Sequence, residues 1–372
     1  MMKLTFNGGE FVCNENGLNY ETVLEDFKAA KMIRILTYNI SKNIKDDKLI
    51  ELLENIHDTV DIEIITNIPS RFPQYYNSKA GDAMRAAFKN NCDIYLKKLD
   101  PENFQAPIFS AFNFKNHAKI IGTENIVYIG SANYSNESNY NIETGIIICD
   151  KEFIKSLYVE FFEYIKGNSI PYFNDDFNTL RLFVVSMETK FKIHYQKLMD
   201  SLFYIQQSTN NIRLRNTQTY LSREDLYELE ADIDELIGLD IVIEDTYSDD
   251  DEYNDVVDLL VQLYNKLSLD SMIQFSMEDS DLCNYIRFDI NEMTNDCLEK
   301  YSAEAYDEYL EEYVSRATED AQDIWEGMKD ELEPEAVEFL EEIKKIVDTL
   351  EVMHEKLVEV ATSRISPEID NT

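Results

Sequence analysis

HAKIIGTENIVYIGSAN, residues 117–133, is the stretch that decides how the first half of this chain folds. Two short apolar runs, HAKIIG and NIVYIGS, flank the three residues 123–125, and this spacing predicts a β-hairpin. On an extended strand His117 and Lys119 project from the same face, because one residue separates them. The stretch therefore predicts a strand face that carries an imidazole beside a fixed positive charge.

The end of the same stretch adds neutral hydrogen-bonding groups. Residues 130–133, Gly-Ser-Ala-Asn, place a hydroxyl and an amide two positions apart, among small residues that let a ligand approach the backbone. Glu143 follows on the next predicted strand. An imidazole, a cation and two neutral polar groups suit a phosphate diester, whose oxygens bind charge-assisted donors.

Outward from the hairpin, strand and helix patterns alternate. Apolar β-branched runs predict strands, and apolar residues at helical spacing predict helices. The predicted strands are residues 32–40, 61–68 and 141–150, and the predicted helices are residues 47–56, 78–91 and 151–168. Alternation of this kind indicates an α/β sandwich.

The charge divides the chain near residue 170. Residues 1–170 hold 18 Lys and Arg against 23 Asp and Glu, a net charge of −5, whereas residues 171–372 hold 16 against 50, a net charge of −34. No proline lies between Pro171 and Pro334, and such an acidic, Leu-rich stretch predicts helices. We therefore expect a domain over 1–170 and an acidic all-α region over 171–372, with a subdivision at the charged segment 245–255.

Apolar residues follow a heptad near the C-terminus. From Ala336 onward they are Leu340, Ile343, Val347, Leu350, Leu357 and Ala361, with His354 on the same seam. A run of about three heptads is short for a coiled coil, so the pattern favours a terminal helix packed on its own domain.

The stretch 117–133 resembles the HKD signature of the phospholipase D superfamily, His-x-Lys followed by Asp and by Gly-Ser-x-Asn. The matching residues are His117, Lys119, Gly130, Ser131 and Asn133. Glu124 stands at the Asp position, and the hairpin is one residue shorter than in the signature. The resemblance covers roughly residues 30–165 and implies a phospholipase D type of α/β sandwich in the N-terminal half.

The resemblance also implies a two-step displacement at phosphorus that needs no metal and no cofactor. His117 attacks phosphorus and forms a phosphohistidine, while a second His protonates the leaving oxygen and then activates water. The remaining roles implied by the resemblance are oxygen binding by Lys119 and Asn133, phosphate binding by Ser131, and fixing of the His117 tautomer by Glu143.

One chain carries one copy of the motif. None of the other histidines, His57, His194 and His354, has a Gly-Ser-x-Asn sequence of its own. The second His must then come from another chain, so we expect a homodimer with two motifs facing each other across a twofold axis.

The leading prediction is a nuclease that cuts DNA or RNA. The joining of a single-copy domain to a second region also resembles restriction or phage-defence effectors, by analogy of architecture. The alternatives are a lipid phosphodiesterase or phosphatidyl transferase, and a non-catalytic dimeric scaffold. The acidic region has three interpretations: a soluble helical domain, a docking site for a basic protein partner, or a cover for the nucleic-acid groove.

Some residues near the motif have two interpretations each. Lys79, Arg85, Lys89, Lys97, Lys98 and Lys115 either line a path for a polyanion or only add solubility. Tyr134 and Tyr140 flank the motif loop, where they either stack on a base or, as the abundance of Tyr favours, pack in the fold.

Composition limits the remaining classes. The five Cys residues form no CxxC pair, which predicts reduced thiols rather than a zinc site or a disulfide framework. No stretch approaches the roughly 18 apolar residues that a spanning helix needs. We therefore expect a cytoplasmic protein without membrane insertion.

Overall fold

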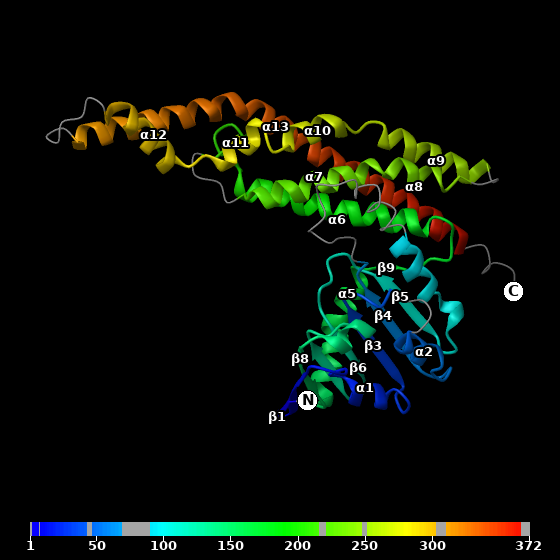
Figure 1. Cartoon of the computed structure of the whole chain (residues 1–372). Coiled ribbons are helices and arrows are strands. Elements are labelled where there is room, and N and C mark those ends of the chain that lie inside the picture. Colours follow the sequence, from blue (N-terminus) through cyan, green and yellow to red (C-terminus); the bar gives the residue numbers. More distant parts are fainter. Residues whose placement is uncertain are drawn as a thin grey trace. The chain divides into compact units, whose positions relative to one another are not determined.

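A computed structural model describes residues 2–6, 8–42, 47–68, 90–215, 221–247, 251–302 and 310–365 (Figure 1). These residues form two compact units. The first unit contains the described residues up to Ser186 and those from Leu357 onward, and the second contains Met187–Lys356. Whether residues 1–170 form an independent domain stays a prediction.

The first unit is built on one nine-stranded sheet of order β1-β2-β8-β7-β6-β3-β4-β5-β9. The strands are β1 (Met2–Phe6), β2 (Gly9–Asn14), β3 (Met32–Thr37), β4 (Asp61–Thr66), β5 (Ile108–Phe112), β6 (Ile120–Thr123), β7 (Val127–Gly130), β8 (Glu143–Ile148) and β9 (Ile170–Pro171). The pairs β3–β4 and β4–β5 are parallel, and the other neighbours are antiparallel. Parallel strands need helical crossovers, which explains the alternation in the sequence.

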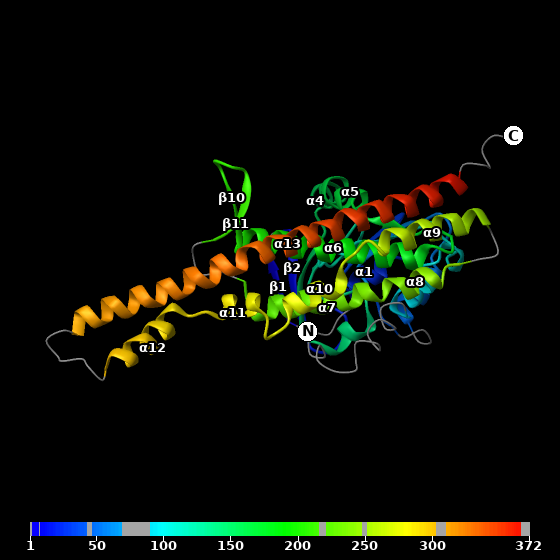
Figure 2. The ribbon, with the colours of Figure 1, turned by 90° about the horizontal axis from the view of Figure 1, so that it is seen from above.

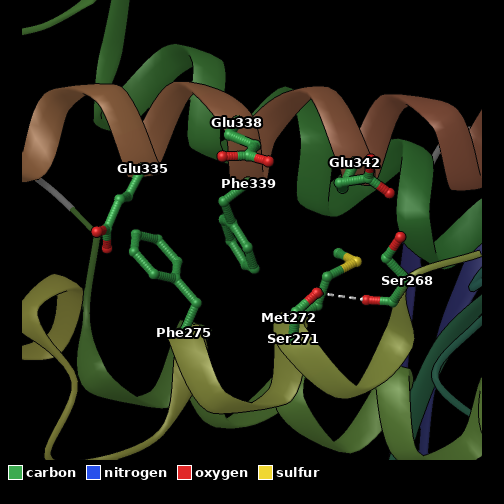
Figure 3. A pocket seen from close by; sticks show the side chains of 8 residues that line it. All are labelled: Ser268, Ser271, Met272, Phe275, Glu335, Glu338, Phe339 and Glu342. Carbon is green, nitrogen blue, oxygen red and sulfur yellow. Dashed lines mark hydrogen bonds between the residues drawn. The ribbon is translucent and has the colours of Figure 1, made fainter.

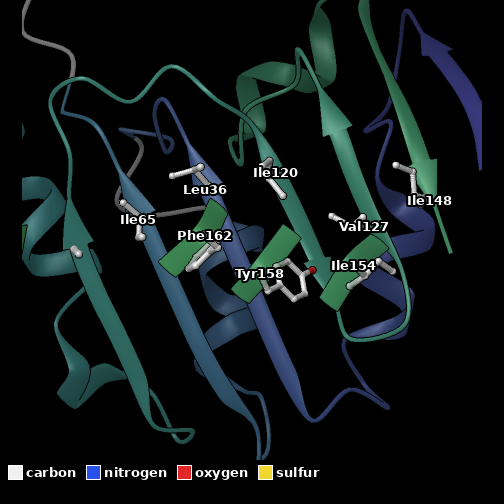
Figure 4. Close-up of a cluster of buried hydrophobic side chains, with 9 residues drawn as sticks. Leu36, Ile65, Ile120, Val127, Ile148, Ile154, Tyr158 and Phe162 are labelled. Carbon is white, nitrogen blue, oxygen red and sulfur yellow. The ribbon is translucent and has the colours of Figure 1, made fainter. Parts of the chain in front are cut away.

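Helices accompany the sheet. They are α1 (Glu21–Asp26), α2 (Lys48–Glu54), a helix over residues 90–98, α4 (Lys151–Ser156) and α5 (Glu163–Gly167), with a π-helical turn, η4 (Leu157–Phe162), between the last two. Figure 4 shows Phe162 beside Leu36 and Ile65 of the central strands, and Ile154 beside Val127 of β7 in the same buried cluster. β3 and β4 are buried at nearly every position, because both of their faces are covered.

The predicted α/β sandwich is confirmed, and so are its main elements. β3, β4 and β8 lie within the three predicted strands, α2 lies within 47–56, and β6 pairs with β7 as the predicted hairpin. Patterning missed β1, β2, β5 and β9, which are short or lie at the sheet's two ends. The predicted helix over 78–91 lies outside the described residues except for its last two positions, which begin the helix over 90–98.

The second half is largely helical. Its helices are α6 (Asn178–Ser201), α7 (Arg223–Ile237), α8 (Leu239–Glu244), α9 (Asp251–Tyr264), α10 (Leu269–Ser276), α11 (Asp281–Arg287), α12 (Ile290–Ser302) and α13 (Leu310–Ile365). The all-α expectation is wrong in one place, because β10 (Phe203–Gln206) and β11 (Asn211–Leu214) form a hairpin (Figure 2). Asn210 has a φ of 58° there, a left-handed turn conformation that Asn tolerates better than most residues.

Two further expectations about this half are refined. The charged segment 245–255 is only partly a linker, since α9 already begins at Asp251. The heptad residues from Ala336 to Ala361 are buried, as expected for a packed helix, but α13 is 56 residues long and continues through Pro334. No described helix is both long enough and apolar enough to cross a membrane.

Candidate active site

The motif residues meet at one edge of the sheet. β3 and β7 end at this edge, at Thr37 and Gly130, and the antiparallel strands β6 and β8 begin there. Ile120 pairs with Ile129, so the segments before β6 and after β7 are neighbours, and β3 and β8 flank them on either side. The sheet therefore brings together residues that are separated by up to about a hundred positions in the chain.

His117 and Lys119 lie just before β6, not on a strand as the sequence predicted. Asn113 begins a turn here. Pairing between the segments of β6 and β7 begins at Lys119, whose carbonyl oxygen accepts from the backbone N–H of Gly130 at 3.2 Å. The side chains are nevertheless in contact. Nζ of Lys119 lies 3.0 Å from Nδ1 of His117 and 2.6 Å from the His117 carbonyl oxygen.

The pKa values of both groups are lowered, for partly different reasons. Partial burial and the neighbouring Lys119 ammonium lower the pKa of His117. Burial lowers the pKa of Lys119, and the carboxylate of Glu143 partly offsets this. His117 is exposed whereas Lys119 is buried, so a ligand reaches the imidazole first.

Ser131 and Glu143 form a pair across β7 and β8. The Ser131 hydroxyl donates to the Glu143 carboxylate and accepts from the backbone N–H of Thr144 at 3.0 Å. The other hydrogen bond of Glu143 comes from Nδ2 of Asn141, at 3.5 Å. Since its partners in the described structure do not include His117, the role of Glu143 in fixing the His117 tautomer stays a prediction.

Asn133 is held by the segment that follows β3. Its Oδ1 accepts from the backbone N–H of Tyr38 at 3.2 Å. Its backbone N–H donates to the Ser138 hydroxyl at 2.9 Å. With Oδ1 occupied, the amide nitrogen Nδ2 is the group that Asn133 can offer to a ligand.

Three tyrosines that the motif does not include support the site. Tyr38 lies beside His117, with ring centroids 4.5 Å apart. The Tyr20 hydroxyl donates to the carbonyl oxygen of Asn133 at 2.9 Å, and the Tyr128 hydroxyl accepts from the N–H of Ala132 at 3.1 Å. Tyr20 and Tyr38 meet the motif only in the folded sheet, so no spacing rule finds them, whereas Tyr128 lies within the stretch 117–133.

Gly130 and Gly145 leave room for the Tyr128 ring, and these glycines are the feature of the sequence that could have revealed its position. A Cβ at Gly130 would lie 2.2 Å from the Tyr128 hydroxyl, and one at Gly145 would lie 2.3 Å from the ring. These two residues pair in register, so both strands leave room for the ring. Glycine in a strand commonly marks such a close approach.

Glu124, which replaces the signature's Asp, is structural. Its carboxylate accepts from the backbone N–H groups of Lys31, at 3.0 and 3.1 Å, and of Met32, at 3.2 Å, where β3 begins. The hairpin turn is held separately, since Asp26 accepts from Thr123 at 2.5 Å and from Asn125 at 3.1 Å. Although the hairpin is one residue shorter than in the signature, His117 and Lys119 are still in contact.

The basic and tyrosine candidates near the motif differ in whether their side chains are buried or exposed. Lys98 is buried in an ion pair with Asp47 at 2.5 Å, so it lines no path, whereas Lys97 and Lys115 are exposed. The remaining three basic candidates, Lys79, Arg85 and Lys89, lie outside the described residues. Tyr134 is buried, as packing predicts, and its hydroxyl donates to the Leu49 carbonyl at 2.8 Å. Tyr140 is 79% exposed.

No cluster of His, Cys, Asp and Glu suited to a metal occurs in the described parts of the chain. A hollow in the second unit lies between α10 and α13 (Figure 3). Its floor contains Met272, Phe275 and Phe339, and carboxylates of Glu335 and Glu338 lie at its rim. It contains no residue of the motif.

The comparisons agree with the motif. Residues 25–165 match the family model described as cardiolipin synthase, PLD-like domain. This part of the chain is therefore a phospholipase D-like domain, and the chemistry it indicates is that of a phosphodiesterase. No curated protein sequence matches the chain significantly.

Solved structures of low sequence identity are also similar. Nuc from Salmonella typhimurium, a phospholipase D family member, is 17% identical, with 44% of this chain and 97% of that chain covered and a TM-score of 0.30. NucT from Helicobacter pylori is 15% identical, with 43% and 99% covered and a TM-score of 0.28. Phosphatidylserine synthase from Haemophilus influenzae is 16% identical, with 44% and 40% covered and a TM-score of 0.30.

Proposed function

We propose that this protein is a nuclease that cleaves phosphodiester bonds of DNA or RNA through a phosphohistidine intermediate. The observation that carries the proposal is the convergence of His117, Lys119 and Asn133 at one sheet edge, with Lys119 in contact with His117. An exposed imidazole, a buried cation and an amide donor match the needs of a phosphate whose charge grows during attack.

The proposed first step forms the bond between an imidazole nitrogen of His117 and phosphorus. The bond from phosphorus to the leaving oxygen breaks, and a protonated second imidazole supplies the proton that this oxygen takes. In the second step the same imidazole removes a proton from water, and the water oxygen displaces His117. Lys119 and Nδ2 of Asn133 bind the non-bridging oxygens in both steps.

We propose that the second imidazole is His117 of another copy of the chain. The three other histidines are each near a carboxylate: His57 lies 2.8 Å from Asp58, His194 lies 2.7 Å from Asp232, and His354 lies 3.0 Å from Glu188. His57 and His194 have no lysine two positions later, and His354, which is followed by Lys356, lies within helix α13 and has no Gly-Ser-x-Asn sequence of its own. A twofold dimer supplies two identical imidazoles, which then take opposite protonation states.

Nucleic acid is the favoured substrate because an exposed basic side chain lies near the exposed His117. Lys115 lies two residues before His117 and is exposed. A specific observation keeps the lipid alternative as a second candidate: Ile142, next to Glu143, is 71% exposed, and Tyr140 is 79% exposed. Exposed apolar groups of this kind also suit a dimer contact.

The deciding experiment compares four substrates in the presence of EDTA: single-stranded DNA, duplex DNA, RNA and phospholipid vesicles. We expect cleavage of at least one nucleic acid, no dependence on added metal, and loss of cleavage in His117→Ala. Cleavage of phospholipid alone would favour the lipid enzyme. No cleavage of any substrate by the intact dimer would favour the non-catalytic scaffold.

For the acidic region we propose restraint of the nuclease or docking of a basic protein partner. The support is the contrast between a net charge of −34 over residues 171–372 and −5 over residues 1–170. A role in phage defence is proposed from the two-part architecture. Its test is plaque formation on cells that express the protein, with His117→Ala as the matched control.

A further inference from the structure

Tyr38 contacts three members of the candidate site at once. Its ring is inclined at 48° to the His117 imidazole, with centroids 4.5 Å apart. Nζ of Lys119 lies 5.3 Å from the centroid of the same ring. Its backbone N–H donates to Oδ1 of Asn133 at 3.2 Å.

Each contact restricts a different side chain. A ring beside an imidazole limits the rotation of that imidazole, and an aromatic face attracts an ammonium group. A backbone donor fixes which end of the Asn133 amide faces inward, so Nδ2 is left for the ligand. The orientation of His117, the position of Lys119 and the direction of Asn133 therefore share one support.

The backbone that carries Tyr38 is itself fixed from both sides. The Thr37 hydroxyl accepts from the N–H of Tyr134 at 2.9 Å and donates to the carbonyl of Asn39 at 2.9 Å. The Tyr95 hydroxyl bonds both the N–H and the carbonyl of Ile40, each at 3.2 Å. A residue held in this way can position its neighbours before a ligand arrives.

We propose that Tyr38 is a positioning residue, whose ring orients His117 and Lys119 and whose N–H orients Asn133 for attack on phosphorus. The proposal rests on the proposed function for the reaction, but the placement of His117 is measurable without turnover. The side-chain hydroxyl takes no part in the three contacts, so the aromatic ring and the backbone N–H are the active features.

The kinetic test uses bis-4-nitrophenyl phosphate and the full chain. Tyr38→Leu should lower kcat by about 30-fold or more with KM changed by less than about threefold, because His117 loses its orientation while the Lys119 ammonium and the backbone N–H bonded to Asn133 are both retained. Tyr38→Phe should stay within about threefold of the natural protein, since it keeps the ring and the N–H. Tyr164→Leu, at a 66% exposed position on α5, is the matched control.

The structural test follows the ring protons of His117 by NMR with labelled histidine. The chain has four histidines, and His117→Ala assigns the signal. In Tyr38→Leu this signal should move to the position of an imidazole with no ring beside it, whereas Tyr38→Phe should keep the natural position. Thermal unfolding verifies that Tyr38→Leu is folded.

Two results would overturn the proposal. One is an unchanged His117 signal in folded Tyr38→Leu. The other is equal loss of kcat in Tyr38→Phe and Tyr38→Leu, because the hydroxyl and not the ring would then be responsible. If the signal moves as expected but the natural protein cleaves no phosphodiester, the positioning of His117 stands and the proposed function fails.

Discussion

The ammonium nitrogen of Lys119 lies 3.0 Å from Nδ1 of His117. An ammonium group only donates hydrogen bonds, so Nδ1 accepts and a neutral imidazole carries its proton on Nε2. Attack through Nε2 requires the other neutral tautomer, in which Nδ1 holds the proton and Nε2 has a free lone pair. A bound phosphate favours that change, because its oxygens attract Lys119 away from Nδ1.

Lys119→Met should raise the pKa of His117. The positive charge of Lys119 is one of the two causes that lower this pKa, and burial of the ring is the other. Removing the like charge favours the protonated imidazole. An NMR titration of His117 in the free protein measures the change, with Lys115→Met as the control for an exposed lysine nearby. An unchanged or lower pKa in Lys119→Met would contradict the contact.

His117→Ala should lower kcat by at least about 10³-fold, because the nucleophile is lost. His117 is exposed, so the same substitution should leave the temperature of unfolding nearly unchanged. Turnover and thermal unfolding of one preparation check both parts. Cleavage at close to the natural rate would exclude His117 as the nucleophile.

Glu143 and Ser131 should act as a unit. Because the Ser131 hydroxyl donates to the Glu143 carboxylate, Glu143→Gln and Ser131→Ala each disturb the same hydrogen bond. If the two residues act through this one hydrogen bond, the loss of kcat in the double variant should be smaller than the product of the fold-losses in the two single variants. A double-variant cycle measures this coupling. Independent, additive losses would instead favour a direct action of Glu143 on His117 or Lys119.

The sequence predicted the central part of the fold because its signals are local. The apolar runs of β3 and β4 and the hairpin of β6 and β7 are readable from periodicity alone. The motif residues were found through their resemblance to the HKD signature, which is also a local pattern. Their convergence also required the pairing of β3 with β6 and of β7 with β8.

What the sequence did not predict depends on contacts between distant segments. Tyr38 joins the site because β3 pairs with β6, and this pairing brings it within reach of Asn133, 95 residues away. Lys98 is a comparable failure: its charge suggested a surface role, but Asp47 binds it inside the fold. Charge alone does not distinguish an exposed lysine from a paired, buried one.

A mixed dimer tests the second imidazole. If both steps need two His117 side chains, a dimer of one natural chain and one His117→Ala chain should be nearly inactive. Purification through two different tags isolates this species, and its rate is compared with that of the natural dimer. About half of the natural rate in the mixed dimer would mean that each chain works alone. Full activity of a monomer at high dilution would also exclude the dimeric site.

The acidic region is best tested in the intact chain. Truncation at residue 170 would remove Arg181, which is buried and donates to the carbonyl of Leu357 at 3.0 Å within the first unit. Loss of such a buried contact would damage the first unit itself. Neutralising exposed carboxylates avoids this problem, because surface substitutions usually change stability by less than about 0.5 kcal/mol each.

Four exposed glutamates of α13 serve this purpose: Glu331, Glu335, Glu338 and Glu341. Changing all four to Gln should strengthen nucleic-acid binding about threefold or more at ~0.01 M salt, where charges act over about 30 Å, and the gain should shrink near 0.15 M, where they act over about 8 Å. Changing the same four to Asp keeps the charge and is the control. Equal binding by both variants at every salt concentration would exclude restraint by the charge of this region. Docking of a basic partner or a structural role would then be the remaining interpretations.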